Sequence, residues 1–442
     1  RIEYKTTNKS MNVKSLQNVF KGDKVVWMIF FFLCMISIIE VYSASSSLSY
    51  KGGNFWGPII YHTVMLAIGW VAMVFVLNVE CRYFKLATPI FLIVSVFLLY
   101  IVMGIGSVTN GASRWISIFG IQFQPSELGK GALIMTIAQL LSAMQTDYGA
   151  DRKAIKYILF VSGVVILPIF SENLSTAALL FLTVIFMMVI GRVSMKQIGK
   201  LMGVIFLFVA LGLAFVMFAG NSDNAEVDNR KQNLTEQTAK RQEQKKETGI
   251  IAKVFHRADT WKARINKFFN HKYVAPKDFD LDKDAQVAHA NIAIASSNIV
   301  GKGPGNSNER DFLSQAFSDF IYAIIIEEMG ILGAFVVLAL YVILFIRVGI
   351  IARRCENSFP TFLAMGLAFL LVSQAMFNMA VAVGLAPVTG QPLPLISKGG
   401  TSSIINCVYI GAILSISRSA KRRTNSKKEE NHQGLTVTVA NA

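Results

Sequence analysis

The sequence is poor in the residues that carry metal, redox and disulfide chemistry. It contains 4 cysteines and 5 histidines among 442 residues. The cysteines lie inside or at the ends of apolar runs, and they show neither zinc-ligand spacing nor a secreted disulfide framework. Three histidines share one polar loop, again without ligand spacing. We therefore expect structural thiols and no zinc centre. The residues concerned are Cys34, Cys81, Cys355, Cys407, His256, His271 and His289.

Charge is scarce as well, and this scarcity excludes an ordinary soluble protein. Only 16% of the residues are charged, whereas 53% are hydrophobic, 32 are Phe, and the mean hydropathy is +0.49. Repeated apolar runs of about 20 residues match the thickness of a bilayer. The net charge of +16 would suggest nucleic acid as the partner of a soluble protein. Here the basic residues gather in short loops and in the tail, so membrane lipids are the expected partner and nucleic acid is not.

The apolar runs predict an all-α polytopic membrane protein with about ten transmembrane helices. Residues 25–219 are expected to hold helices 1–7, and residues 319–417 helices 8–10. One large extracytoplasmic loop, residues 220–318, separates these groups. Residues 1–24 form an N-terminal segment, of which residues 1–10 are set aside because Met11 is the first plausible initiator. The helices are expected near 25–43, 58–79, 84–106, 126–144, 155–171, 174–191, 199–219, 319–347, 360–386 and 402–417.

Lysine and arginine gather on alternate loops and near both ends of the chain. The positive-inside rule therefore predicts that both termini are cytoplasmic, that the 220–318 loop is outside, and that residues 418–442 form a basic cytoplasmic tail. Anionic lipid is the expected partner of this tail. The intervening loops are poor in positive charge, and their main basic residues are Lys51, Arg114 and Lys398.

Four extramembrane segments have distinctive composition. Residues 250–269 alternate basic and apolar positions, as a helix lying on the membrane surface does. Residues 110–130 are too polar and glycine-rich to span, yet they carry aromatic residues, which favours a short interfacial or re-entrant segment. Residues 301–307, GKGPGNS, form a glycine-rich turn that lacks the ending of a P-loop. Residues 384–403 contain prolines and glycines that prevent a regular helix.

Residues 318–330, SDFIYAIIIEEMG, place three carboxylates at the start of the eighth run. Asp319 stands at its outer lip, and Glu327 and Glu328 lie roughly 12–14 Å deeper at the helical rise. Carboxylates in a spanning segment are costly and mark candidate functional sites. The structural alternative is that Ser318 or Asp319 only caps the helix. Residue chemistry by itself gives the two interpretations equal weight.

Two further acidic residues, Glu127 and Glu40, lie in or near predicted spans. Glu127 and Lys130 sit three residues apart at the start of a helix led by Pro125. They either neutralise each other at the helix end or place a carboxylate and an ammonium in a cavity shared with Asp319. Glu40, near the end of the first span, is expected at the membrane interface.

Five motifs, in this order along the chain, resemble the SEDS family (shape, elongation, division and sporulation), which comprises the FtsW, RodA and SpoVE peptidoglycan glycosyltransferases. The resemblance covers about residues 25–420 and is closer to division-type members, as judged from residues 305–307 and 374–378. The chain departs from the family pattern at several places, among them residues 171–176 and Lys398. The motifs are GASRWI (111–116), FQPSELGK (123–130), GKGPGNS (301–307), SDFIYAIIIEEMG (318–330) and GLAPVTGQPLPLISKGG (384–400).

The resemblance implies a bacterial enzyme of the cytoplasmic membrane that polymerises lipid II at the outer face, for septal wall synthesis in cell division. The family's catalytic aspartate falls on Asp319. Such a carboxylate suits the task of accepting the proton of an attacking sugar hydroxyl. The substrate-binding residues that we expect, some from family positions and the rest from the matching motifs, are Glu127, Lys130, Arg114, Arg264, Gln286, Lys302, Ser397 and Lys398.

The leaving undecaprenyl pyrophosphate needs cationic compensation, from Lys130, Arg264, Lys398 or a divalent cation such as Mg²⁺ or Mn²⁺. The sequence itself requires no cofactor. The family implies a class B penicillin-binding protein, a transpeptidase, as partner, together with other divisome membrane proteins. Three alternatives stay open: a lipid II flippase or other transporter, an elongation-type polymerase, and a scaffold that recruits cell-wall proteins.

Overall fold

The computed structural model describes residues 21–52, 57–105, 107–109, 112–118, 121–219, 281–313 and 317–440. Each predicted apolar run coincides with a helix. These helices are α2 (Lys24–Gly52), α3 (Gly57–Asn78), α4 (Cys81–Ile105), α5 (Pro125–Ala143), α6 (Ala154–Glu172), α7 (Leu174–Ile190), α8 (Met195–Ala219), α13 (Ile321–Arg353), α14 (Ser358–Ala382) and α15 (Thr401–Ala440).

The chain is a polytopic membrane protein, as predicted. In the described part, seven helices are long and apolar enough to cross a membrane: α2, α3, α4, α6, α13, α14 and α15. Helix α7 is apolar but shorter, with 17 residues. The total of ten spans therefore stays a prediction.

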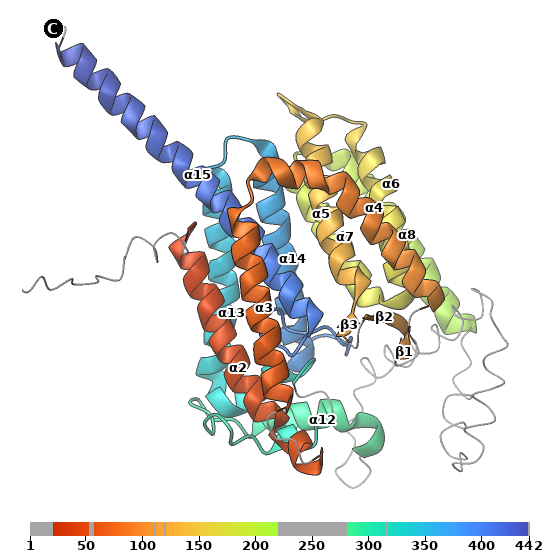
Figure 1. Ribbon diagram of the computed structural model, residues 1–442. Coiled ribbons are helices and arrows are strands. Elements are labelled where there is room, and N and C mark those ends of the chain that lie inside the picture. Colours follow the sequence, from red (N-terminus) through yellow and green to blue (C-terminus); the bar gives the residue numbers. More distant parts are fainter. Residues whose placement is uncertain are drawn as a thin grey trace, which may run out of the picture.

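The helices form two neighbouring groups, and α14 lies between them (Figure 1). Helix α15 packs on α3, and α13 packs on α2 and α14; α14 also packs on α5 and α7. The fully buried side chains of Leu133, Ile134 and Ile137 lie in the common hydrophobic core. Helix α12 (Leu281–Ala295) and the small sheet lie at the same end of the bundle, opposite the end of α15 (Figure 1).

The turn between α6 and α7 is as tight as predicted. Asn173 is at once the C-cap of α6 and the N-cap of α7. Its side chain accepts a hydrogen bond from the backbone N–H of Thr176, which satisfies one of the free donors at the start of α7. The chain therefore turns from α6 into α7 at Asn173 alone.

The predicted interfacial segment 110–130 contains β-strands ahead of α5. Strands β1 (Ser107–Thr109), β2 (Ala112–Ile118) and β3 (Ile121–Phe123) form an antiparallel sheet with β2 in the centre. Ile116 pairs with Phe123 in this register. Pairing within a sheet satisfies backbone groups that a bare loop near the membrane would leave unpaired. A second ribbon, β4 (Gln145–Thr146) and β5 (Gly149–Ala150), joins α5 to α6.

The expected continuous helix over 319–347 is wrong in two respects. Helix α13 begins at Ile321, and its N-cap position is Phe320, whose side chain makes no cap hydrogen bond, so neither Ser318 nor Asp319 occupies the N-cap position. The helix is also interrupted at Gly330, whose φ of 71° and ψ of −173° are not helical. Residues 321–328 form a short half-helix that is buried on all sides.

The break at Gly330 exists because another backbone segment crosses it. Ile331 and Leu332 donate backbone hydrogen bonds to the carbonyls of Asn298 and Ile299, while Lys302 donates to the carbonyl of Glu327. A Cβ on Gly330 would lie 2.3 Å from the carbonyl oxygen of Ile299. Only glycine combines this backbone conformation with so close an approach.

The basic tail continues the last span as helix. Helix α15 runs without interruption to Ala440, past the predicted end of the tenth span at 417, and it projects beyond the bundle (Figure 1). The predicted surface helix at 250–269 lies outside the described residues. None of the four cysteines is in a disulfide in the described part of the chain.

Candidate active site around Asp319

Asp319 lies in the turn just before α13, and its side chain is partly exposed. The hydroxyl of Ser318 donates a 2.9 Å hydrogen bond to its Oδ1. Its other carboxylate oxygen, Oδ2, lies so close to the backbone of Gly390 that a Cβ there would be 3.3 Å away. Gly390 has φ of 70°, a conformation that favours glycine. The irregular segment 384–400 therefore passes directly beside the carboxylate.

Two residues of that segment hold the turn containing Asp319 in place. The Ser397 hydroxyl donates to the carbonyl of Ser318 at 2.6 Å, and the backbone N–H of Lys398 donates to the carbonyl of Phe317 at 2.9 Å. The ammonium of Lys398 lies over the Phe317 ring, 5.0 Å from its centroid. Burial lowers the pKa of the Lys398 amino group below its ordinary value. Ser397 is thus a structural contact of the turn, and Lys398 is the cation beside it.

Asn378 of α14 joins the two segments that flank the carboxylate. Its Nδ2 donates to the carbonyl of Asp319 at 2.8 Å and to the carbonyl of Gln391 at 2.7 Å. The Gln391 side chain in turn donates to the Thr176 hydroxyl at 2.7 Å, which ties the same segment to α7. Asn378 and Gln391 are both buried.

Glu127 and Lys130 are buried, with residue exposures of 4% and 1%, and form an ion pair of 2.9 Å. Lys130 also donates to Oε1 of Gln374 at 3.1 Å, and Gln374 donates to the carbonyl of Pro392. The Glu127 oxygen of the ion pair lacks hydrogen-bond geometry, so this contact is a charge interaction. Gln374 therefore links the pair to the segment beside Asp319, and the cavity shared with Asp319 stays a prediction.

The other predicted site residues lie elsewhere or outside the described part. Lys302 pairs with Glu327 at 2.6 Å and donates to the Ser296 hydroxyl, so its charge is already neutralised. Gln286 is on α12 and is partly buried. Arg114 is on β2, but its side chain is not among those that the structure describes. Arg264 lies outside the described residues.

Glu327 and Glu328 bind the glycine-rich turn. Glu327 accepts from the Ser307 hydroxyl at 2.5 Å and from the backbone N–H of Asn308 at 3.1 Å. Glu328 accepts from the backbone N–H of Gly305 at 3.0 Å and from the Ser43 hydroxyl. Both carboxylates are fully buried and surrounded by donors, as buried charges must be. Their contacts are those of anchors for the 301–308 turn.

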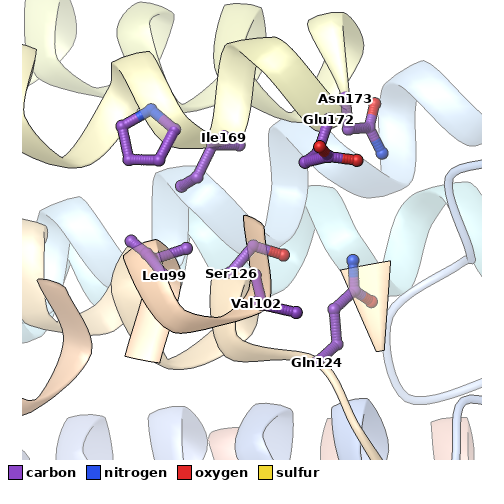
Figure 2. A pocket seen from close by; sticks show the side chains of 8 residues that line it. Leu99, Val102, Gln124, Ser126, Ile169, Glu172 and Asn173 are labelled. Carbon is purple, nitrogen blue, oxygen red and sulfur yellow. The ribbon is translucent and has the colours of Figure 1, made fainter. Parts of the chain in front are cut away.

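A small, partly open cleft lies between the ends of α4 and α6 and the start of α5. Figure 2 shows Leu99 and Ile169 at one end of it and Gln124, Glu172 and Asn173 at the other. None of the described residues that line the cleft is a lysine or an arginine. Asn173 links the cleft to the start of α7, where Thr176 receives the Gln391 side chain.

Sequence reasoning missed the roles of Gln374, Asn378 and Gln391. A signal was present, because Gln374 and Asn378 are the side-chain amides of α14 and stand four residues apart on one face of an otherwise apolar helix. The acceptors of the Gln374 and Asn378 amide N–H groups are backbone carbonyls, those of Pro392, Asp319 and Gln391. Such partners leave no residue pattern in a sequence.

The fold and the site together define a polytopic helical membrane protein with a carboxylate-centred polar network at one end of its bundle. Residues 23–237 and 247–422 match the family model described as cell cycle protein, FtsW/RodA/SpoVE. The chain therefore belongs to this family, as the resemblance of its motifs predicted.

Curated relatives and solved structures match this chain along almost its whole length. A probable peptidoglycan glycosyltransferase FtsW of Geobacter sp. (strain M18) is 30% identical over 89% of this chain and 96% of its own length. The peptidoglycan glycosyltransferase MrdB of Escherichia coli (strain K12) is 24% identical over 94% and 98%. The rod shape determining protein RodA of Thermus thermophilus, solved by crystallography, shares the fold with a TM-score of 0.59 at 19% identity, covering 91% and 99%. A chain of a solved peptidoglycan synthase complex that coordinates polymerization and crosslinking has a TM-score of 0.64 at 20% identity, covering 91% and 99%.

Proposed function

We propose that this protein is a peptidoglycan glycosyltransferase that polymerises lipid II into glycan strands, in the division-type role. Membership of the family and the names of its relatives support the reaction. The observation that carries the assignment to a site is the environment of Asp319. A partly exposed carboxylate is held by its neighbours, and one flank is kept free of side-chain atoms by Gly390.

The chemistry assigns one task to Asp319. The 4-hydroxyl of one saccharide attacks the anomeric carbon of another, forming the glycosidic bond as the bond to undecaprenyl pyrophosphate breaks. The hydroxyl proton passes to the Asp319 carboxylate, which acts as general base. The pyrophosphate leaves with the electron pair of the broken bond and requires nearby positive charge.

Among the described cations, Lys398 contacts this turn through Phe317. We assign to it the role of neutralising the leaving pyrophosphate. Burial lowers the pKa of its amino group, and a bound anion would offset this lowering. Lys130 is less suited to direct contact because it is 1% exposed and already holds Glu127 and Gln374. In the described residues no group of three His, Cys, Asp or Glu side chains is placed to hold a metal ion. A divalent cation at this site would therefore rely on phosphate oxygens of the substrate.

Location and partners complete the proposal. The end of the bundle that carries α12, the sheet and Asp319 faces the exterior of the cytoplasmic membrane, and both termini are cytoplasmic. The solved complex with a related fold couples polymerization to crosslinking. A class B penicillin-binding protein is accordingly the proposed partner, and membrane lipids surround the spans.

The test is polymerisation of lipid II by the purified protein in detergent, alone and with its transpeptidase partner. The Asp319→Asn variant keeps the shape of the side chain but cannot accept a proton, so its rate should fall on the order of 10²–10⁴-fold. Asp311→Asn is the matched control, because Asp311 lies on the same connecting region and its side chain is half exposed.

Each outcome has a distinct meaning. Wild-type protein that binds lipid II and forms no polymer under any of these conditions would favour a transporter or a scaffold. Polymerisation by Asp319→Asn at the wild-type rate, with normal folding, would remove Asp319 from the mechanism but leave the reaction intact.

A further inference from the structure

Two amide side chains of α14 occupy the space between Asp319 and the Glu127–Lys130 pair. Gln374 is 2% exposed and Asn378 is 1% exposed. Each donates a hydrogen bond to a backbone carbonyl of the irregular segment, Gln374 to Pro392 and Asn378 to Gln391. Because the residues are one helical turn apart, they hold two adjacent peptide groups of that segment against one face of α14.

Each amide also has a second contact on the opposite side. Asn378 donates to the carbonyl of Asp319, and Gln374 accepts from the ammonium of Lys130. A continuous chain of contacts therefore runs from Glu127 through Lys130 and Gln374 to residues 391–392, and from there through Asn378 to Asp319. Its members come from α5, α14, the irregular segment and the turn before α13.

The chemistry of the amide group matters at position 378. Both partners of Asn378 are carbonyl oxygens, so the side chain must supply two N–H donors from one nitrogen. A carboxylate of the same shape has no donor to offer when ionised, and an alanine leaves both carbonyls without partners. The other atom of the amide, Oδ1, is buried and has no hydrogen-bond partner among the described residues. Only the donor side of this amide is used.

We infer that Asn378 is a positioning residue for the reaction, and that Gln374 supports it from one turn away. Asn378 fixes the Asp319 backbone relative to the Gly390–Gln391 backbone and so sets the place of the carboxylate beside the irregular segment. A shift of about 1 Å in a reacting group is enough to cost on the order of 10²-fold in rate. This inference rests on the proposed function, because it assumes that Asp319 is the catalytic group.

The experiment compares Asn378→Ala and Asn378→Asp with wild type in steady-state polymerisation of lipid II. Both variants should lower kcat by at least about tenfold, and KM should stay within about twofold, because Asn378 acts through Asp319 and does not touch the substrate. Gln374→Met should change kcat in the same direction and by less, since it leaves both Asn378 contacts in place. Melting temperature in detergent is measured for every variant.

Asn357→Asp is the matched control. It makes the same substitution at the N-cap position of the same helix, at the other end, where the exposed Asn357 forms no side-chain cap hydrogen bond. It should leave kcat, KM and melting temperature unchanged. If Asn378→Asp fails to fold, Asn378→Ala and Gln374→Met still provide the split between kcat and KM.

The results that overturn the inference are specific. The inference is overturned if Asn378→Ala keeps the wild-type kcat. It is also overturned if the loss of activity equals the loss of folded protein and nothing more. A rise in KM with unchanged kcat would place Asn378 in substrate binding and would also contradict positioning. These outcomes differ from failure of the proposed function, which would appear as no polymer from wild type or full activity of Asp319→Asn.

Discussion

Glu40 shows what a single residue contributes inside this bundle. It lies on α2 with a fully buried side chain, and neither carboxylate oxygen has a hydrogen-bond partner among the described residues. The interfacial depth of Glu40 stays a prediction, since the apolar span of α2 ends at Ser43, and at this depth the side chain lies in the interior of the bundle. Glu328 of α13 is its acidic neighbour, and that carboxylate is already engaged by the glycine-rich turn.

A buried carboxyl group without hydrogen-bond partners opposes folding, because it has lost its contacts with water. We predict that Glu40→Gln leaves the melting temperature in detergent unchanged or raises it by a few degrees, the shift that about 1 kcal/mol produces. Glu40→Ala, which opens a cavity, should lower stability by about 1–3 kcal/mol, in the lower range of large-to-small core substitutions. A large loss of stability in Glu40→Gln would show instead that the carboxylate binds a cation.

At the scale of elements, the break in α13 decides where Asp319 lies. The half-helix 321–328 is buried on all sides, and the crossing segment at Gly330 separates it from the long second half. Glu327 and Glu328, at the end of the half-helix, hold the turn that crosses it. Only the first turns of the eighth span, residues 321–328, therefore lie next to Asp319.

We predict that Gly330→Ala destabilises the protein by more than about 2 kcal/mol. The strained backbone conformation alone costs an alanine on the order of 1–3 kcal/mol, and the contact with the Ile299 carbonyl adds to this. Gly349→Ala is the control on the same helix, because a Cβ there meets nothing within 4 Å. Helix propensity should make that control neutral or stabilising by up to about 1 kcal/mol. Equal melting temperatures for the two variants would contradict this account.

At the opposite end of the bundle, an ion pair joins α2 to α13. Both carboxylate oxygens of Asp23 share the Nε–H of Arg347, and Oδ2 also accepts from its Nη2 at 2.7 Å. Burial raises the pKa of Asp23, but hydrogen bonds and charge from Arg347 and the backbone N–H groups of α2 outweigh it, so the pKa is lowered. This stabilisation is present above the unfolded-state pKa of about 3.9 and is lost as pH falls through the lower native value.

Asp23→Asn should cost about 1–3 kcal/mol at neutral pH, the range of a charge-assisted hydrogen bond. Asparagine still caps α2, so the substitution isolates the ion pair. The difference in melting temperature between wild type and Asp23→Asn should be constant above about pH 5 and shrink below about pH 4. A difference that persists unchanged in acid would assign the effect to packing.

At the scale of the whole molecule, the predicted orientation in the membrane is open to a direct test. Tyr148, in the β4–β5 ribbon, is 99% exposed, and Phe312, beside α12, is 64% exposed. In a cysteine-free background, Phe312→Cys should react with a membrane-impermeant maleimide from outside the cytoplasmic membrane. Tyr148→Cys should react only after the membrane is opened. The reverse pattern would invert the topology and place Asp319 in the cytoplasm.

Much of the molecule followed from the sequence because its cause is local. Spans of apolar residues cannot remain in water, so all ten predicted runs became helices. Pro125 started α5, and Asn173 turned the chain between α6 and α7. The prolines and glycines of 384–400 kept that segment irregular. The position of Glu127 and Lys130 on one face of α5 also followed from helical spacing.

Tertiary structure decided what required partners distant in sequence. The break at Gly330 depends on residues 298–303 crossing the helix, and the anchoring of Glu327 and Glu328 depends on the turn that follows. Asn378 acquired its role because two backbone carbonyls, of Asp319 and Gln391, converge on one amide. Every residue has such a carbonyl, so a sequence shows where donors and acceptors are, and only the fold determines which of them meet.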